Sequence, residues 1–381
     1  MATPVPASIR DRVVPKHVEM EVDKLFRIVM KHEGSDLHLK VGLPPMMRLA
    51  GTLRQMQLPV LTEEQMEQLT LPMLTVAQAE TLAETGGVDF AHVIGDEEGR
   101  FRVNLFRQRG RLSLVARSVK TEIPDFEALH LPSIVEDLSK YSQGMVLLAG
   151  VTGSGKSTTI ASMLQYINRT RRVHIVTIED PIEYLFRDEK SIINQREVGI
   201  DVADWEMAMK HVVREDPDVI LVGEMRDRAT FQTAMQAAET GHLVFGTIHA
   251  STAPSTIARI LDLFPTDMHG ALRSSMAFNM RAIIAQKLLP SIREGVQRVP
   301  ACEIMTFNPT VRKLILDEED DKLSDAIRIA RQEQMQDFTE SLRYLVAEEF
   351  VDRATAFEVA PNVEALKMAL KGISVSQPGI L

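Results

Sequence analysis

The strongest constraint on the fold is a set of four short apolar runs, each followed by a helix-like stretch. The runs are Met145 to Ala149, His174 to Ile178, Val219 to Val222 and Leu243 to Phe245. Continuously apolar strands that alternate with helices are typical of a parallel sheet that is covered on both faces. The pattern predicts an α/β domain whose ligands gather at the carboxyl ends of the strands.

A phosphate-binding motif follows the first of these strands. Gly150-Val-Thr-Gly-Ser-Gly-Lys-Ser157 matches G-x-x-x-x-G-K-[ST] and opens the helix-like stretch Ser157 to Ile167. The glycines let the loop curl so that its N–H groups point inward, and the helix start adds positive charge. Lys156 is expected to reach the β- and γ-phosphates, and Ser157 to ligate Mg²⁺. The predicted ATP-binding loop is Gly150, Val151, Thr152, Gly153, Ser154, Gly155, Lys156, Ser157 and Thr158.

The third strand ends beside a carboxylate that is suited to hydrolysis. Glu224 follows Gly223 directly after Val219 to Val222, so we expect it at the ligand edge of the sheet. A carboxylate there can orient the attacking water next to the γ-phosphate. Gly223 stands where an aspartate often assists Mg²⁺, so the ion would be held by Ser157, phosphate oxygens and water. The alternative is an ordinary exposed acid at a strand end.

Two further groups lie near strand ends. Glu179, Asp180 and Glu183 follow the second strand, where they could bind Mg²⁺ through water or position the nucleophile. His242 and His249 bracket the fourth strand, and a neutral imidazole at position 249 could sense the γ-phosphate. Solvated loop acids and a structural histidine are the alternatives.

The first 120 residues have a different pattern, α-β-β-α-β-β-β, which predicts a small α+β domain with an antiparallel sheet. An amphipathic helix is expected between Val18 and Met30, one strand from Leu37 to Val41 and one from Met46 to Met56. Helices then precede three more strands. Residues 121–125 are interpreted as a linker, 126–373 as the ATPase domain, mostly helical beyond Pro254, and 374–381 as a tail.

Composition excludes several classes of protein. The chain has 43 Lys plus Arg, 53 Asp plus Glu and a net charge of −10, which disfavours bulk binding to nucleic acid or anionic lipid. Its one cysteine, Cys302, cannot form an intramolecular disulfide or a multi-cysteine zinc site. No run approaches a membrane span, so we expect a cytoplasmic protein without membrane insertion. The acidic run Asp317 to Asp321 is typical of a solvated loop, although it could bind a cation.

Taken together, the motifs resemble those of the secretion and type IV pilus ATPases, most closely the retraction (twitching motility) branch, PilT and PilU. Ser35-Asp-Leu-His-Leu39 and Gly42-Leu-Pro-Pro45 resemble the family's PAS-like domain. The phosphate loop, Thr177 to Glu183, Val219 to Glu224 and Gly241 to His249 correspond to its Walker A, Asp, atypical Walker B and His boxes.

The resemblance implies a PAS-like domain followed by a RecA-like ATPase domain, assembled as a hexamer with ATP between the domains. It gives Glu224 the role of catalytic glutamate and Glu183 that of the Asp-box acid, and it places His242 and His249 near the nucleotide. It also implies arginines from the first domain, for which the sequence offers several candidates without a choice among them, and ordinary surface arginines as the alternative. The candidates of the first domain are Arg102, Arg107, Arg109, Arg111 and Arg117. Arg259, which flanks the boxes of the second domain, is another candidate.

Two features bear on the branch of the family. The zinc module of the extension and secretion motors is absent, which favours retraction. Where PilT-type motors carry Ala-Ile-Arg-Asn-Leu-Ile, this chain has Thr310-Val-Arg-Lys-Leu-Ile315, which favours the PilU-like paralogue. The expected partners are a paralogous retraction ATPase and the pilus platform protein of the inner membrane. The alternatives are an ATP-binding accessory ring and, less in keeping with an acidic chain of 5% aromatic residues, a nucleic-acid translocase.

Overall fold

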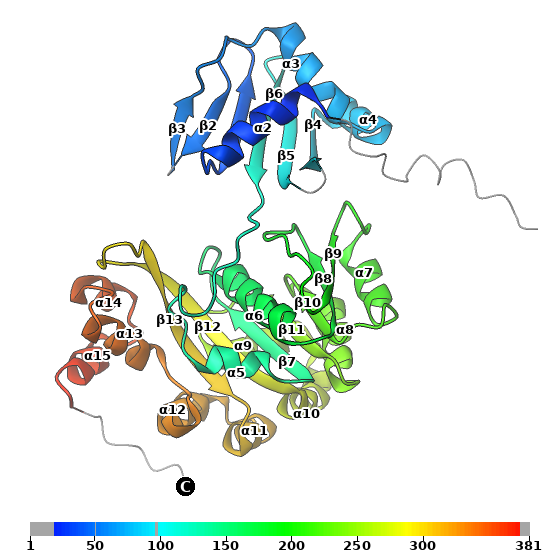
Figure 1. Ribbon diagram of the computed structural model, residues 1–381. Coiled ribbons are helices and arrows are strands. Elements are labelled where there is room, and N and C mark those ends of the chain that lie inside the picture. The colour runs from blue at the N-terminus through cyan, green and yellow to red at the C-terminus, as the bar shows by residue number, and fades with distance from the viewer. Residues whose placement is uncertain (1–18, 50, 96–97, 374–381) are drawn as a thin grey trace, which may run out of the picture. The chain divides into compact units, whose positions relative to one another are not determined.

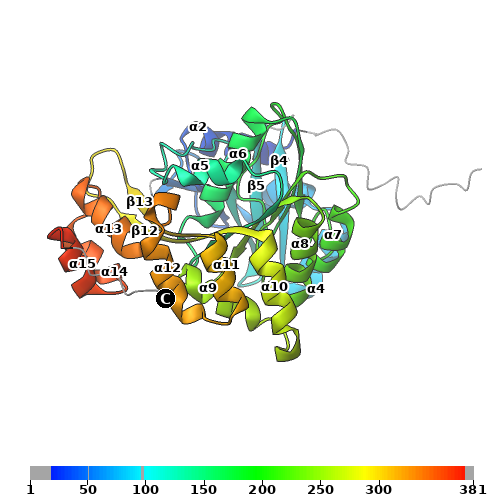
Figure 2. The same ribbon diagram turned by 90° about the horizontal axis from the view of Figure 1, so that it is seen from below.

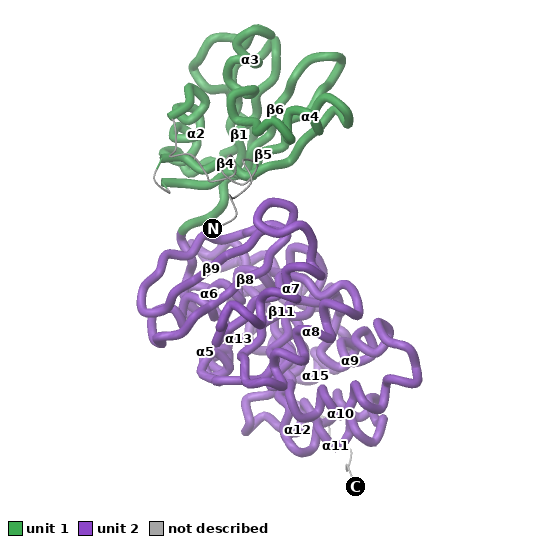
Figure 3. The backbone as a smooth tube through the Cα atoms, turned by 90° about the vertical axis from the view of Figure 1, so that its right-hand side faces the viewer, with its two compact units in different colours: residues 1–121 green, residues 122–381 purple. Residues whose placement is uncertain are grey.

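The computed structural model describes residues 19–49, 51–95 and 98–373. The chain divides into two compact units, residues 1–121 and 122–381 (Figures 1 and 3). Unit 1 has one hydrophobic core, and unit 2 has one core on each face of its sheet.

Unit 1 is an antiparallel sheet of six strands in the order β3-β2-β1-β6-β5-β4. Leu37 and Leu39 of β1 face the helices and are almost completely buried, whereas His38 between them faces the other side. The strands are β1 (Asp36–Lys40), β2 (Met46–Leu49), β3 (Thr52–Gln55), β4 (Gly87–Ile94), β5 (Gly99–Gln108) and β6 (Arg111–Ser118). The helices are α2 (Glu21–Lys31), α3 (Glu63–Thr70), η1 (Leu71–Met73) and α4 (Val76–Thr85). The expected α+β domain is confirmed.

The segment expected as a single strand from Met46 to Met56 is instead the hairpin β2-β3, so this prediction is wrong. Gly51 has a φ of +82°, a conformation that glycine adopts without a steric penalty, and the chain reverses there. An apolar pattern that continues through a short turn does not reveal the reversal.

Unit 2 is built on a seven-stranded sheet in the order β13-β12-β7-β11-β10-β8-β9. All neighbours are parallel except β12 and β13. The strands are β7 (Gly144–Ala149), β8 (His174–Glu179), β9 (Ile192–Glu197), β10 (Val219–Val222), β11 (Leu243–Ile248), β12 (Met280–Pro290) and β13 (Arg298–Thr306). The four predicted parallel strands and the α/β fold are confirmed.

Helices cover both faces of this sheet (Figure 2). Helices α5 (Ile134–Ser139) and α6 (Lys156–Thr170) pack on one face against Val146 and Leu148 of β7. The other face, with Met145 and Leu147, is covered by helices later in the chain. The helices after α6 are α7 (Trp205–Val212), α8 (Arg228–Glu239), α9 (Ala253–Leu261), η2 (Thr266–Met268), α10 (His269–Asn279), α11 (Pro309–Leu316), η3 (Asp320–Lys322), α12 (Leu323–Ile329), η4 (Arg331–Glu333), α13 (Phe338–Ala347), α14 (Arg353–Val359) and α15 (Val363–Leu370).

The expectation of a mostly helical chain beyond Pro254 is wrong for β12 and β13. Strand β12 pairs in parallel with β7 and antiparallel with β13, so it is an interior strand of the sheet. Its run Ala282 to Ala285 is completely buried, and a short buried apolar run has the same periodicity in a helix as in a strand. Strand β9 also escaped prediction, because an edge strand with exposed polar residues lacks the apolar signal.

The acidic run Asp317 to Asp321 is partly tied to the body of unit 2. Arg273 of α10, which is largely buried, donates two hydrogen bonds to Asp320 at 2.8 and 2.6 Å and a third to the Ile315 carbonyl at 3.0 Å. Arg273 therefore joins α10 to the end of α11 and to η3, and Asp320 is not simply a solvated acid.

Replacing this arginine should destabilise unit 2. In Arg273→Met the carboxylate of Asp320 and the Ile315 carbonyl lose charged donors, and the free energy of unfolding should fall by about 2 kcal/mol. The matched control is Lys322→Met in the same loop, because the Lys322–Glu319 pair is solvent-exposed and should leave the unfolding midpoint almost unchanged. Urea unfolding followed by circular dichroism makes the comparison. Equal midpoints for the two variants would contradict it.

Candidate active site

The carboxyl ends of four parallel strands lie along one edge of the unit 2 sheet. Ala149 at the end of β7 is in register with Ile248 of β11, and Val222 of β10 is in register with Ile178 of β8. The phosphate loop, Glu179, Glu224 and His249 each follow or end one of these strands. The structure therefore brings together most of the residues that the sequence predicted for the site.

The phosphate loop has the backbone that its glycines allow. Gly150, Gly153 and Gly155 have φ angles of +151°, +79° and +92°. A Cβ at Gly150 would lie 2.6 Å from the carbonyl oxygen of Gln286, and one at Gly155 would lie 2.7 Å from its side-chain nitrogen. The Gln286 side chain also accepts a hydrogen bond from Thr159 of α6 at 2.9 Å. Strand β12 therefore supports the loop from behind, a role for Gln286 that no sequence motif indicated.

Lys156 closes the loop on itself. Its Nζ donates to the carbonyl oxygens of Gly150 and Val151 at 2.8 and 3.0 Å. The residue is 8% exposed, and burial lowers the pKa of its ammonium while the charge of Glu224 opposes that shift. The hydroxyl of Ser154 is buried without a hydrogen-bond partner in the described part of the chain. An ammonium and an unsatisfied hydroxyl inside a loop of curled backbone fit a phosphate group.

Glu224 is held by two partners at the edge of the sheet. Its Oε2 accepts a hydrogen bond from Arg226 at 2.6 Å, and its Oε1 lies 3.0 Å from Nε2 of His249. The hydrogen bond from Arg226 is the main cause that lowers the pKa of Glu224, and the charges of Arg226, His249 and Lys156 add to it. Glu224 and His249, each expected at this edge of the sheet, are thus neighbours. Arg226 was missed, since an arginine two residues after a strand carries no motif.

Gly223 is required by close packing of β10 against β8. Its N–H donates to the Ile178 carbonyl at 2.8 Å, and a Cβ would lie 3.1 Å from that oxygen and 3.3 Å from Cα of Glu179. An aspartate there would be crowded. The residue suited to Mg²⁺ is Ser157, an exposed residue in the first turn of α6. Mg²⁺ bound with a nucleotide would therefore rely on this hydroxyl, phosphate oxygens and water.

Glu179 does not fit its predicted role as a metal ligand. Its Oε1 accepts hydrogen bonds from Thr177 at 2.7 Å and Gln195 at 3.2 Å, and burial raises its pKa to about 7. A buried carboxyl with a raised pKa, whose oxygen is already hydrogen-bonded, is a poor ligand for Mg²⁺. Asp180 and Glu183 are exposed, and the described residues contain no group of three or more His, Cys, Asp or Glu placed to hold a metal ion. The catalytic role of Glu183 stays a prediction.

His242 lies away from the phosphate edge, which corrects its expected place near the nucleotide within this chain. It precedes β11, whereas His249 follows it, and six strand residues separate the two by roughly 20 Å. Its Nδ1 lies 2.8 Å from the Ala237 carbonyl at the end of α8. The physical reason is the direction of the strand, which carries its two ends to opposite edges of the sheet.

Arg102 and Arg117 lie side by side in unit 1. They are paired in register on β5 and β6, and Nε of Arg117 donates to Asp36 at 2.9 Å. Arg117 remains largely exposed, and the same Asp36 also faces Arg48 at 3.5 Å. The part of Arg102 and Arg117 in nucleotide binding stays a prediction.

A parallel sheet with a phosphate loop, a strand-end glutamate and a strand-end histidine defines a P-loop nucleotide-binding protein with a RecA-like core. The family model described as "Type II/IV secretion system protein" matches residues 16–356, and the chain belongs to this family. The chain is 40% identical over 341 residues to the type IV pilus retraction ATPase PilT of Pseudomonas aeruginosa, covering 90% of this chain and 98% of PilT. It is 36% identical over 352 residues to the type IV pilus ATPase PilU of the same organism, covering 92% of each.

A solved structure agrees with this assignment. The crystal structure of the pilus retraction motor PilT with bound ADP has a TM-score of 0.83 and 42% identity, covering 92% of this chain and 99% of that one. The chain is therefore an ATPase of the family that contains PilT and PilU, as the sequence predicted. Identities of 40% and 36% do not separate the two branches, so the PilU-like assignment stays a prediction. Among the described residues, no helix is both long and apolar enough to span a bilayer.

The pH dependence of ATP turnover should depend on Arg226. Arg226→Ala removes the main group that lowers the pKa of Glu224, so the carboxylate becomes protonated at a higher pH. The acidic limb of the pH–turnover profile should move to higher pH. Arg228→Ala, two residues further and on the first turn of α8, is the matched control and should leave that limb in place. A shift of equal size in both variants would contradict the role of Arg226.

Glu179 should make folding stability fall as pH rises. Its pKa of about 7 lies above the ordinary value of 4.5, so the folded state binds more protons than the unfolded state between these values. The contribution of this group to stability is complete below pH 4.5 and is lost as pH rises through about 7, with a slope of about 1.4 kcal/mol per pH unit. Glu179→Gln should remove that part of the slope in urea unfolding at several pH values. Glu183→Gln, an exposed neighbour, should retain it.

Proposed function

We propose that this protein is a motor that hydrolyses ATP to retract a type IV pilus, working as a homo-hexameric ring at the cytoplasmic side of the inner membrane. The observation that carries the proposal is the placement of Glu224 at the end of β10, with His249 and Arg226 on its two oxygens. The relatives named for pilus retraction match nearly the whole chain, which supports the same work for this protein.

In the proposed reaction the phosphate loop and Lys156 hold the β- and γ-phosphates. The Lys156 ammonium and the Glu224 carboxylate lie close enough to affect each other's pKa, so the γ-phosphate would lie next to Glu224. Because Arg226 and His249 favour its ionised form, Glu224 orients the attacking water rather than acting as a strong base. Mg²⁺, when bound with ATP, neutralises phosphate charge.

Coupling to mechanical work requires partners. Arg102 and Arg117 of unit 1 are proposed to neutralise phosphate charge in the assembled ring. The net charge of −10 disfavours unaided binding to anionic lipid, so recruitment to the membrane would be through the pilus platform protein. No nucleic-acid partner is proposed.

ATP turnover by purified protein tests the site. Lys156→Ala and Glu224→Gln should each reduce turnover by about a hundredfold or more, since one removes phosphate binding and the other the water-orienting carboxylate. Glu206→Gln, an exposed acid in the first turn of α7, is the matched control and should turn over ATP normally. Undiminished turnover in both site variants would overturn the proposal.

A second candidate function is an ATP-binding accessory ring that supports a stronger motor. The departure at Thr310 to Ile315 from the PilT pattern favours it. Pilus retraction in cells that carry Lys156→Ala separates the two functions. Retraction that persists with a paralogous motor intact, and is lost when that motor is disabled, supports the accessory ring. Loss of retraction with the paralogue intact supports an independent motor.

A further inference from the structure

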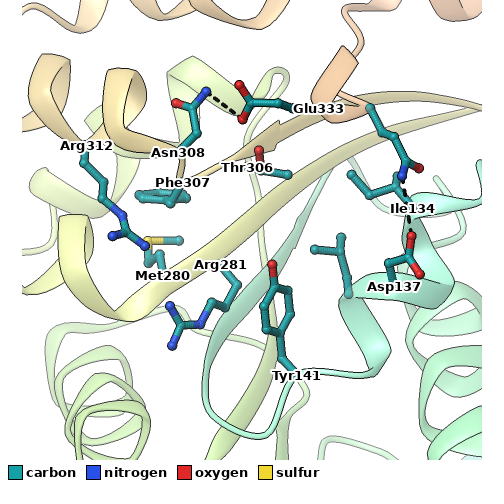
Figure 4. Close-up of a pocket in the computed structure, with 12 residues that line it drawn as sticks. Ile134, Asp137, Tyr141, Met280, Arg281, Thr306, Phe307, Asn308, Arg312 and Glu333 are labelled. Atoms are coloured by element: carbon teal, nitrogen blue, oxygen red, sulfur yellow. Dashed lines mark hydrogen bonds between the residues drawn. The ribbon is translucent and has the colours of Figure 1, made fainter. Parts of the chain in front are cut away.

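A cavity of about 310 Å³ lies at the edge of the unit 2 sheet opposite the phosphate loop. It is lined by residues of α5, the start of β12, the end of β13, α11 and η4, and it is open to solvent on one side (Figure 4). The amino end of β7 borders the same edge, because Met280 of β12 is in register with Met145. This volume is at the lower end of the range for small-ligand pockets. The proposed ATPase mechanism does not use it.

Two arginines in this cavity have unused donors. Arg281 donates from Nε to the Gln143 carbonyl at 2.9 Å, and its guanidinium carbon lies 5.5 Å from the centre of the Tyr141 ring. Arg312 has a buried Nε without a hydrogen-bond partner among the described residues. Neither guanidinium forms an ion pair with any acid in the described ranges of the chain. No carboxylate of the described residues therefore neutralises either guanidinium group, and their terminal nitrogens can donate to an anionic ligand.

The position of Arg281 depends on the absence of a side chain nearby. A Cβ at Gly144 would lie 2.6 Å from Nε of Arg281, and Gly144 itself has a φ of +107°. The guanidinium therefore lies across the start of β7 and stacks on Tyr141, which restricts its motion before any ligand arrives. Preorganised charge of this kind binds an anion with a smaller ordering cost.

Acids at the other end of the cavity limit the ligand's charge. Asp137 interacts with Lys140 at 2.9 Å and Gln334 at 3.5 Å, and Glu333 accepts from Asn308 at 3.0 Å. Figure 4 shows these carboxylates away from the two guanidinium groups. Two nearby acids would repel a dianion more strongly than a monoanion. Between the two ends the lining is apolar or aromatic, with Ile134, Leu138, Met280 and Phe307 buried.

We propose that this cavity is a binding site for a small organic carboxylate. The carboxylate accepts hydrogen bonds from the terminal nitrogens of Arg281 and Arg312, and a short apolar body lies between Tyr141 and the buried apolar side chains. The pairing of guanidinium with carboxylate supplies orientation as well as affinity. Binding there is separate from the phosphate loop, so it does not depend on the proposed motor function.

Calorimetric titration of the full chain tests the site with three probes: 3-phenylpropionate, its neutral isostere 3-phenylpropanamide, and phenyl phosphate. The carboxylate should bind at least tenfold more tightly than the amide. Arg281→Gln and Arg312→Gln should each weaken its binding at least tenfold, and Arg312→Lys should restore part of it. Arg298→Gln is the matched control, because Arg298 lies at the far end of β13, eight residues from Thr306 in the cavity, and should leave binding unchanged.

ATP turnover should remain normal in the arginine variants, which shows that they are folded. Equal binding of the carboxylate and the amide would overturn the proposal, as would undiminished binding in the Arg281→Gln, Arg312→Gln double variant. Tighter binding of phenyl phosphate than of 3-phenylpropionate would overturn the choice of a carboxylate and identify phosphate monoesters as the ligand class. If 3-phenylpropionate shows no saturable binding up to about 10 mM, its binding free energy is weaker than about 3 kcal/mol, and this result would also overturn the proposal.

Discussion

The packing of β12 behind the phosphate loop is the contact on which the nucleotide site depends. Gln286 meets the loop at two glycines through its backbone oxygen and its side-chain amide, and it holds the first turn of α6 through Thr159. Without the contact to Gln286, a loop rich in glycine would have many accessible backbone conformations. Because β12 is an interior strand between β7 and β13, the residue that supports the loop belongs to a strand that is hydrogen-bonded on both sides.

The two glutamates at the edge of the sheet differ in ionisation because they differ in burial and in their partners. Glu224 is ionised because Arg226 and His249 meet its two oxygens at the open edge of the sheet. Glu179 ends the adjacent strand, yet burial raises its pKa to about 7 and neutral partners occupy its oxygen. Two glutamates on neighbouring strand ends therefore have different chemistry. The difference arises from the burial of Glu179 and the charged partners of Glu224 rather than from the residue type.

Local pattern explains what could be predicted from the sequence. The four parallel strands, the phosphate loop and the placement of Glu224 and His249 at one edge follow from apolar runs and from the direction of parallel strands, which brings their ends together. The support by Gln286, the pairing of Arg226 with Glu224 and the burial of Glu179 depend on contacts between segments or on side-chain depth, which a linear pattern does not contain. Strand β12 was missed because its buried apolar run fits a helix as well as a strand. The contact that decides between them is with β7, more than a hundred residues away.

The same sheet presents positive groups at both edges although the chain is acidic overall, with a net charge of −10. At one edge the donors are loop N–H groups and Lys156, and at the other they are the guanidinium groups of Arg281 and Arg312. In both places a glycine of positive φ leaves space for a donor group. Gly150 makes room for the Ser154 hydroxyl, and Gly144 makes room for Nε of Arg281. The net charge of a protein governs its long-range attraction for ions. Binding at each edge of the sheet depends instead on a few donors within one Debye length of the ligand. An acidic protein can therefore bind anions at both edges of this sheet.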